Sequence, residues 1–182
     1  VNTGEAFTLT TGVDTVSGTS GNDSLVGTVS VASATENNST LSALDSIDGG
    51  AGNDTLKVLV ANTNAVADTQ TQLDATSISN IETLEFQSAK QLTVDTSAIS
   101  GVNDVNITKI TTGATDITAS ADQDVTLSNK GVGATVDVND GKDVSVTLTD
   151  IAAAADVVTV NGAAGAVNVS VSGDAYKVAD TN

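Results

Sequence analysis

Short runs in which apolar and polar residues alternate recur along most of the chain, and such runs are typical of β-strands with one buried face. In the C-terminal part they start about ten residues apart, with glycine, asparagine, aspartate or serine between them, as in chains made of many short strands. The runs expected to form strands are residues 81–86, 91–96, 104–108, 115–119, 124–128, 134–139, 143–149, 156–161 and 166–172.

The N-terminal third has a second rhythm, with a period of nine residues. Asp14 and Asp23 are nine residues apart, and so are Asp45 and Asp54, each followed two positions later by an apolar residue. The two pairs are separated by residues 28–40, a small and polar stretch that reads as a loop-like insert. Such internal periodicity is a signature of repeat architectures.

Two all-β folds produce this strand spacing. An antiparallel β-sandwich does so, and so does a parallel β-helix or β-roll, in which equivalent strands stack on one another. The nine-residue period, the recurring Asp–Val at strand starts and the scarcity of aromatic residues (Phe7, Phe86 and Tyr176) favour the parallel solenoid, with the sandwich as the alternative.

Charge and composition exclude several functional classes. The chain has 23 acidic residues against six basic ones, a formal charge of −17, so a nucleic-acid partner is not expected. Histidine and cysteine are absent, and no carboxylate pair stands out, so we expect no enzymatic activity. No apolar run is long enough to span a membrane.

The segment Gly49–Lys57, "GGAGNDTLK", points to a cation site because it fits the nonapeptide G-G-x-G-x-D-x-U-x at every defined position. Its glycines permit a tight loop that directs several carbonyl oxygens to one point, and Asp54 adds a charged oxygen. An all-oxygen ligand set of this kind suits Ca²⁺.

On these residues the chain resembles the hemolysin-type (RTX) calcium-binding repeat proteins. The segments "GTSGNDSLVG", "LDSIDGGAGNDTLKV" and "ISNIETLEF" look more specifically like bacterial surface-layer (S-layer) proteins with such repeats. The resemblance implies a right-handed β-roll or β-helix, type I secretion, calcium-dependent folding outside the cell and self-assembly into a lattice on the bacterial surface.

The resemblance also implies a site, because in that family calcium lies between corresponding loops of adjacent coils. The loop 18–23 should then stack on the loop 49–54, with one ion shared by Asp23 and Asp54. At the opposite edge Asp14 could pair with Asp45, assisted by Asp48. The full set of expected metal ligands is Asp23, Asp54, Gly21, Asn22, Gly50, Gly52, Asn53, Asp14, Asp45 and Asp48.

We therefore expect a calcium-binding β-roll over 1–60, a connector over 61–77 and a β-solenoid continuation over 78–182. The expected function is structural, as an extracellular S-layer component whose partners are copies of itself. Cell-surface polysaccharide would be bound, if at all, through parts of a longer parent chain. The alternative is a calcium-dependent spacer or binding module of a large secreted adhesin or biofilm protein.

Overall fold

The protein is nearly all β in the computed structural model, which describes residues 3–33, 36–61, 70, 72–74, 76–88, 91–110, 113–130, 135–151, 157–173 and 177–180. Its largest sheet, called here the long sheet, is entirely parallel. The strand order of the long sheet is β1 (Ala6–Thr8), β3 (Ser24–Val29), β7 (Thr55–Val60), β9 (Thr83–Ser88), β11 (Asp104–Ile110), β13 (Asp124–Lys130), β15 (Val144–Ile151) and β17 (Val167–Gly173).

Two shorter parallel sheets contain most of the remaining strands. The first is made of β2 (Thr15–Ser17), β6 (Ser46–Asp48) and β8 (Ser77–Ser79). The second is made of β10 (Leu92–Asp95), β12 (Thr115–Thr118), β14 (Val136–Asn139), β16 (Val157–Asn161) and β18 (Lys177–Asp180).

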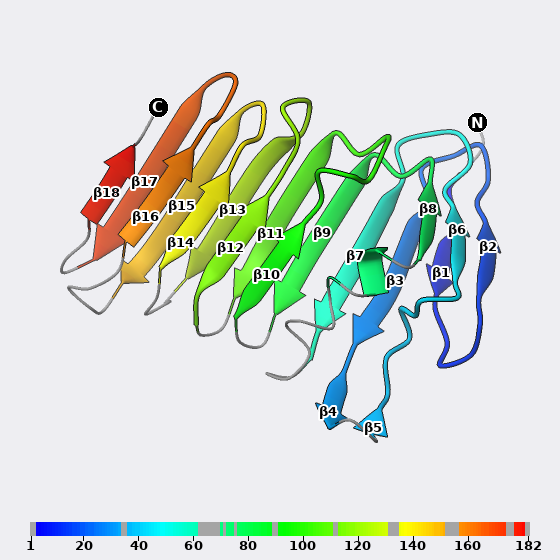
Figure 1. Ribbon diagram of the computed structural model, residues 1–182. Coiled ribbons are helices and arrows are strands. Elements are labelled where there is room, and N and C mark those ends of the chain that lie inside the picture. Colours follow the sequence, from blue (N-terminus) through cyan, green and yellow to red (C-terminus); the bar gives the residue numbers. More distant parts are fainter. Residues whose placement is uncertain are drawn as a thin grey trace.

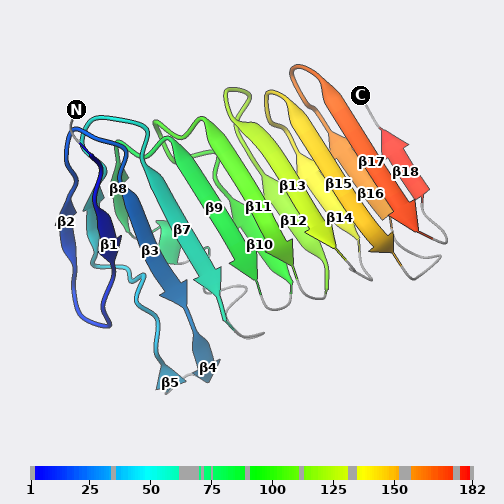
Figure 2. The ribbon, with the colours of Figure 1, turned by 180° about the vertical axis from the view of Figure 1, so that it is seen from behind.

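The chain alternates between the long sheet and the shorter sheets, so that each pair of such strands forms one coil. Figures 1 and 2 show the strands stacked in chain order from the blue N-terminal end to the red C-terminal end. Neighbours in these sheets are parallel, which differs from the antiparallel pairing of a sandwich, the alternative that strand spacing left open. The architecture is all-β with many-stranded parallel sheets, as a parallel solenoid requires.

The core is built by stacking equivalent positions of successive coils, so apolar side chains lie above one another. One such row contains only aromatic, leucine and valine residues: Phe7, Leu25, Leu56, Leu84, Val105, Val125, Val144 and Val167. Leu56 and Leu84 are fully buried, whereas the residues on either side of each are only half-buried. The alternation of apolar and polar residues in the sequence therefore places apolar side chains on the inner face of the coils and polar side chains on the outer face.

The insert 28–40 is not simply a loop, contrary to the expectation from its polar composition. β3 continues to Val29, and β4 (Val31–Ser33) pairs antiparallel with β5 (Glu36–Asn37). Leu41, just after the insert, is fully buried. It occupies the space beside Gly27, where an added Cβ would lie 3.0 Å from the Leu41 Cβ and 2.9 Å from Leu9 Cδ1.

The nine runs expected to form strands each coincide with a strand, from β9 to β17, with bounds that differ by a few residues. The expected connector 61–77 lies partly outside the described residues. Within it, residues 70 and 72–74 are helical and residue 77 begins β8. Because β7 pairs directly with β9, the long sheet continues across this segment. In the part of the chain that the structure describes, no helix has the length and apolar character needed to cross a membrane.

Candidate metal centre

The glycine-rich segments form the corners at which the chain passes from a shorter sheet to the long sheet. The two glycine-rich corner loops are residues 18–23 between β2 and β3 and residues 49–54 between β6 and β7. A third corner loop, residues 80–82 between β8 and β9, contains no glycine. The first two lie on each other as the resemblance to the repeat proteins implies, and the Ala51 N–H donates to the Thr19 carbonyl at 3.0 Å. The Asn53 N–H likewise donates to Asn22 Oδ1 at 3.1 Å.

A ladder of carboxylates joins the corner loops. Asp54 Oδ1 accepts the Asp23 N–H at 2.6 Å, and Glu82 Oε2 accepts the Asp54 N–H at 2.8 Å. Asp23 Oδ1 in turn accepts the Glu5 N–H at 2.5 Å. Each acid thus receives a backbone donor from the preceding coil, which orders the corners relative to one another.

The carboxylate of Asp23 is satisfied within its own loop as well. Its Oδ2 accepts the Thr19 N–H at 2.6 Å, and its Oδ1 accepts the Thr19 hydroxyl at 3.1 Å. The hydrogen bond from the Glu5 N–H, together with those from Thr19, holds the pKa of Asp23 below its ordinary value against the opposing effect of burial. Asp23 is therefore stable as a buried anion.

Asp54 differs, although it occupies the equivalent position and is fully buried. The donor that corresponds to the Thr19 N–H is the Gly50 N–H, which is directed to Asp48 Oδ1 at 3.0 Å. Asp54 Oδ2 accepts no hydrogen bond from any residue that the structure describes. Burial raises the pKa of Asp54, and repulsion from Asp23, Glu82 and Asp48 acts in the same direction.

Glycine is required at these corners because carbonyl and carboxylate oxygens occupy the space of a side chain. A Cβ on Gly18 would lie 1.9 Å from the Gly49 carbonyl oxygen and 2.6 Å from Asp23 Oδ2. At Gly50 and Gly52 the φ angles are +92° and +143°, a region that side chains disfavour. The loops therefore bring main-chain and side-chain oxygens close together.

The opposite edge pairs Asp14 with Asp45, as expected, but both carboxylates are already occupied by hydrogen-bond donors. Asp45 Oδ1 accepts the Asp14 N–H at 2.9 Å, and Asp45 Oδ2 accepts the Ser42 N–H at 2.7 Å. Asp14 Oδ2 accepts the Thr10 N–H at 2.7 Å. At this edge, the backbone N–H groups of Thr10 and Ser42 therefore satisfy the carboxylates of Asp14 and Asp45.

Asp48 does not lie beside Asp14 and Asp45, contrary to the expectation that it assists them. Strand β6 carries it to the far corner, where it accepts the Gly50 N–H and, at 2.7 Å, the Asn80 side-chain amide. The hydrogen bond from Asn80 is the main reason that the pKa of Asp48 is lowered. Asp48 thus lies at the corner loop that contains Asp54, where it binds the Gly50 N–H and the Asn80 side chain.

Sequence reasoning missed Glu82 as a member of the ladder. The signal was present, because Asp23 and Asp54 are each followed by a hydroxyl residue and leucine ("DSL" and "DTL"), and Glu82 begins "ETL". Among the described residues no three acidic side chains converge as a metal-binding group. A cation here would therefore need carbonyl oxygens beside one or two carboxylates, a combination typical of Ca²⁺ sites.

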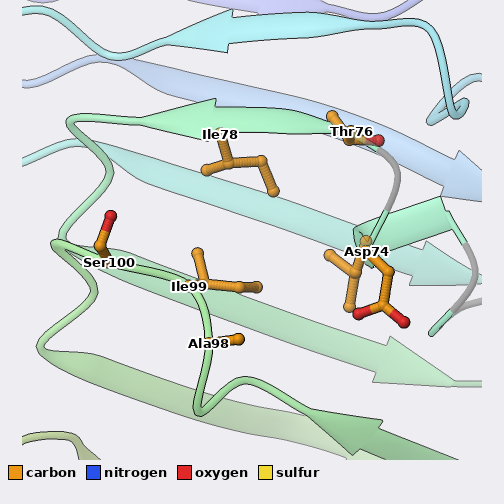
Figure 3. Close-up of a pocket in the computed structure, with 7 residues that line it drawn as sticks. Asp74, Thr76, Ile78, Ala98, Ile99 and Ser100 are labelled. Atoms are coloured by element: carbon orange, nitrogen blue, oxygen red, sulfur yellow. The ribbon is translucent and has the colours of Figure 1, made fainter.

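A separate pocket of about 180 Å³ lies where the three-stranded sheet ends at β8 (Figure 3). Ile78 and Ile99 point into it from two sides, and Asp74 is the one ionisable residue among its described lining residues. The Thr76 hydroxyl at its edge lies 2.6 Å from the Gln72 carbonyl oxygen and 2.8 Å from the Ser42 carbonyl oxygen, so these two acceptors share its one proton. These groups offer no acid–base pair and no metal-ligand set.

No protein-family model matches this chain, and a search of curated proteins finds no match either.

Proposed function

We propose that this chain is a structural segment of a bacterial surface layer, built as a right-handed parallel β-roll or β-helix that Ca²⁺ stabilises outside the cell. Its role in this proposal is mechanical rather than enzymatic. The stacked coils provide a stiff rod, and copies of the chain assemble side by side into a lattice.

The observation that carries the proposal is the buried Asp54 carboxylate, one oxygen of which has no donor among the described residues, in a loop that fits the calcium-binding nonapeptide completely. An ionised carboxylate without a partner is costly to bury. A cation at Asp54 would offset this cost, with carbonyl oxygens of the glycine loops as further ligands. The positive charge would also offset the repulsion that the Asp54 carboxylate experiences from Asp23, Glu82 and Asp48.

Calcium would couple folding to location, because an ion that binds only the folded chain stabilises it by mass action. The chain also carries a formal charge of −17, which opposes a compact state. Bound cations would relieve this repulsion in a calcium-rich exterior, so secretion and folding would be linked.

The proposal is tested by calorimetric titration of the chelator-stripped chain with Ca²⁺, together with far-ultraviolet circular dichroism. We expect saturable binding in the wild type and loss of at least one site in Asp54→Asn, which removes the charge but keeps the shape of the side chain. Asp104→Asn, an exposed acid at the start of β11, is the matched control and should bind as the wild type does. A wild-type chain without measurable calcium binding would contradict the proposal.

A further inference from the structure

The corner loop 80–82 repeats the arrangement of the two glycine-rich corners without sharing their sequence motif. Its flanking residues remain in register, with Ser79 paired to Asp48 and Thr83 paired to Thr55. Six residues (49–54) connect those positions in one coil, but only three (80–82) connect them in the next. The third corner is thus shorter, yet it closes on the same two strands.

Glu82 compensates for this shorter connection. It stands immediately before Thr83 as Asp54 stands before Thr55, and its Oε2 accepts the Asp54 N–H as Asp54 Oδ1 accepts the Asp23 N–H. The extra methylene of glutamate relative to aspartate lets the carboxylate reach the preceding coil from a tighter turn.

The open oxygen of Asp54 lies on the side of this third corner. A Cβ on Gly49 would be 2.7 Å from Asp54 Oδ2 and 1.9 Å from the Asn80 carbonyl oxygen, so both oxygens border the same space. One coil earlier, the equivalent space beside Gly18 is bordered by Asp23 Oδ2 and the Gly49 carbonyl. There the Thr19 N–H satisfies the carboxylate, whereas beside Gly49 no donor from the described residues does so.

Asn80 is held in a conformation that fixes its carbonyl. Its φ angle is +51°, which is uncommon for a residue other than glycine, and its side-chain amide donates to Asp48 Oδ1 at 2.7 Å. The Gly49 N–H donates to the neighbouring Ser79 carbonyl at 3.0 Å. The Gly49 N–H therefore does not occupy the Asn80 carbonyl oxygen, which borders the space beside Gly49.

We propose that a hard divalent cation, Ca²⁺ by its ligand chemistry, binds between the corner loops 49–54 and 80–82, ligated by Asp54 Oδ2, the Glu82 carboxylate and the Asn80 carbonyl. This inference rests on the proposed function, since it needs calcium binding by the chain. It extends the cation-bound edge by one coil beyond the nonapeptides, onto the strand β9. Glu82 is then a metal ligand that the repeat motif does not identify.

The test compares wild type, Glu82→Gln and Asp54→Asn by calorimetric titration of the full chelator-stripped chain with CaCl₂. The amide introduced by Glu82→Gln would keep a carbonyl oxygen to accept the Asp54 N–H, so the variant should fold. We expect Glu82→Gln to weaken one site by about tenfold or more, the usual consequence of losing a charged ligand. Asn80→Gly, which keeps the carbonyl and the left-handed conformation, should retain calcium binding to within a few-fold.

Two-dimensional amide NMR of the same samples locates the ion. In the wild type, Ca²⁺ should shift the amide signals of residues 80–82 together with those of 49–54, and in Glu82→Gln the shifts at 80–82 should need a higher calcium concentration. Unchanged affinity in Glu82→Gln, with binding still lost in Asp54→Asn, would overturn this inference and leave the proposed function standing. Absence of calcium binding in the wild type would overturn both.

Discussion

At the scale of single residues, the corner of Asp54 shows how one backbone donor decides the chemistry of a carboxylate. Asp23 and Asp54 occupy equivalent positions and both are buried. Thr19 caps the first, whereas the Gly50 N–H is directed to Asp48 and leaves the second with an open oxygen. The two aspartates therefore differ in one backbone donor. The Thr19 N–H closes the turn at Asp23, whereas the Gly50 N–H points to Asp48 and leaves Asp54 Oδ2 as a candidate cation ligand.

Gly49→Ala is expected to destabilise the chain and to weaken calcium binding. The new Cβ would lie 1.9 Å from the Asn80 carbonyl oxygen and 2.7 Å from Asp54 Oδ2, so the corner loops would have to move apart. Overpacking of this kind costs about 1–3 kcal/mol in the free energy of unfolding, which denaturant titration in the presence of Ca²⁺ measures.

Gly12→Ala is the matched control for that substitution. The nearest atom to its added Cβ, the Thr10 hydroxyl oxygen, is 3.6 Å away, an ordinary van der Waals distance. We expect this variant to change the free energy of unfolding by less than about 0.5 kcal/mol. Equal destabilisation of the two variants would contradict the geometry described for the corner of Asp54.

At the scale of elements, the same corner is built differently at the N-terminal and C-terminal ends of the long sheet. Gln123, just before β13, occupies the position that Asp54 holds before β7, and it is 1% exposed. Its Oε1 accepts the Ser120 N–H and the Thr96 hydroxyl at 3.0 Å and 2.9 Å, and its Nε2 donates to the Thr96 carbonyl at 3.0 Å. A neutral amide thus closes this corner without any ion.

We therefore expect removal of calcium to loosen the N-terminal coils and to leave the C-terminal coils largely intact. Hydrogen–deuterium exchange with and without chelator measures this difference. Amides of the corner loops 18–23 and 49–54 should exchange at least about tenfold faster without calcium, while those of β11, β13 and β15 should change little. Equal loss of protection in all coils would show that the two parts do not differ in their dependence on calcium.

At the scale of the whole molecule, acidity and stacking act together. Basic residues neutralise only a small part of the charge, as in the pairs Lys57–Glu85 at 2.9 Å and Lys142–Asp124 at 3.7 Å. With 23 acids and six lysines, most of the negative charge must be screened by solution ions. We therefore expect copies of the chain to approach one another closely only when cations are present.

Electron microscopy of the full chain, dialysed from chelator into CaCl₂, tests this expectation. We expect ordered two-dimensional arrays with calcium and dispersed molecules without it, and Asp54→Asn should assemble only at higher calcium concentrations. Isolated fibres would instead favour a spacer module of a secreted adhesin. Dispersed molecules at every calcium concentration would contradict self-assembly of this chain.

The sequence by itself determined the all-β class and nine strands of the C-terminal part, β9 to β17, and the resemblance of its nonapeptides to calcium-binding repeats implied the stacking of the loop 18–23 on the loop 49–54. These features depend on local alternation and on a short repeat, both of which can be read within windows of about ten to twenty residues.

The tertiary structure alone decided which carboxylate oxygens are satisfied, that Asp48 and Glu82 belong to the corner of Asp54, and that the insert contains an antiparallel strand pair. The places of Asp48 and Glu82 depend on contacts between residues 28 to 32 positions apart, such as Glu82 with Asp54 and Asn80 with Asp48. The strand pair of the insert is local, but the polar composition of the insert did not predict it. The number of residues between equivalent positions differs from coil to coil, so it cannot be read from the sequence. The parallel register of the sheets defines which residues of neighbouring coils contact each other.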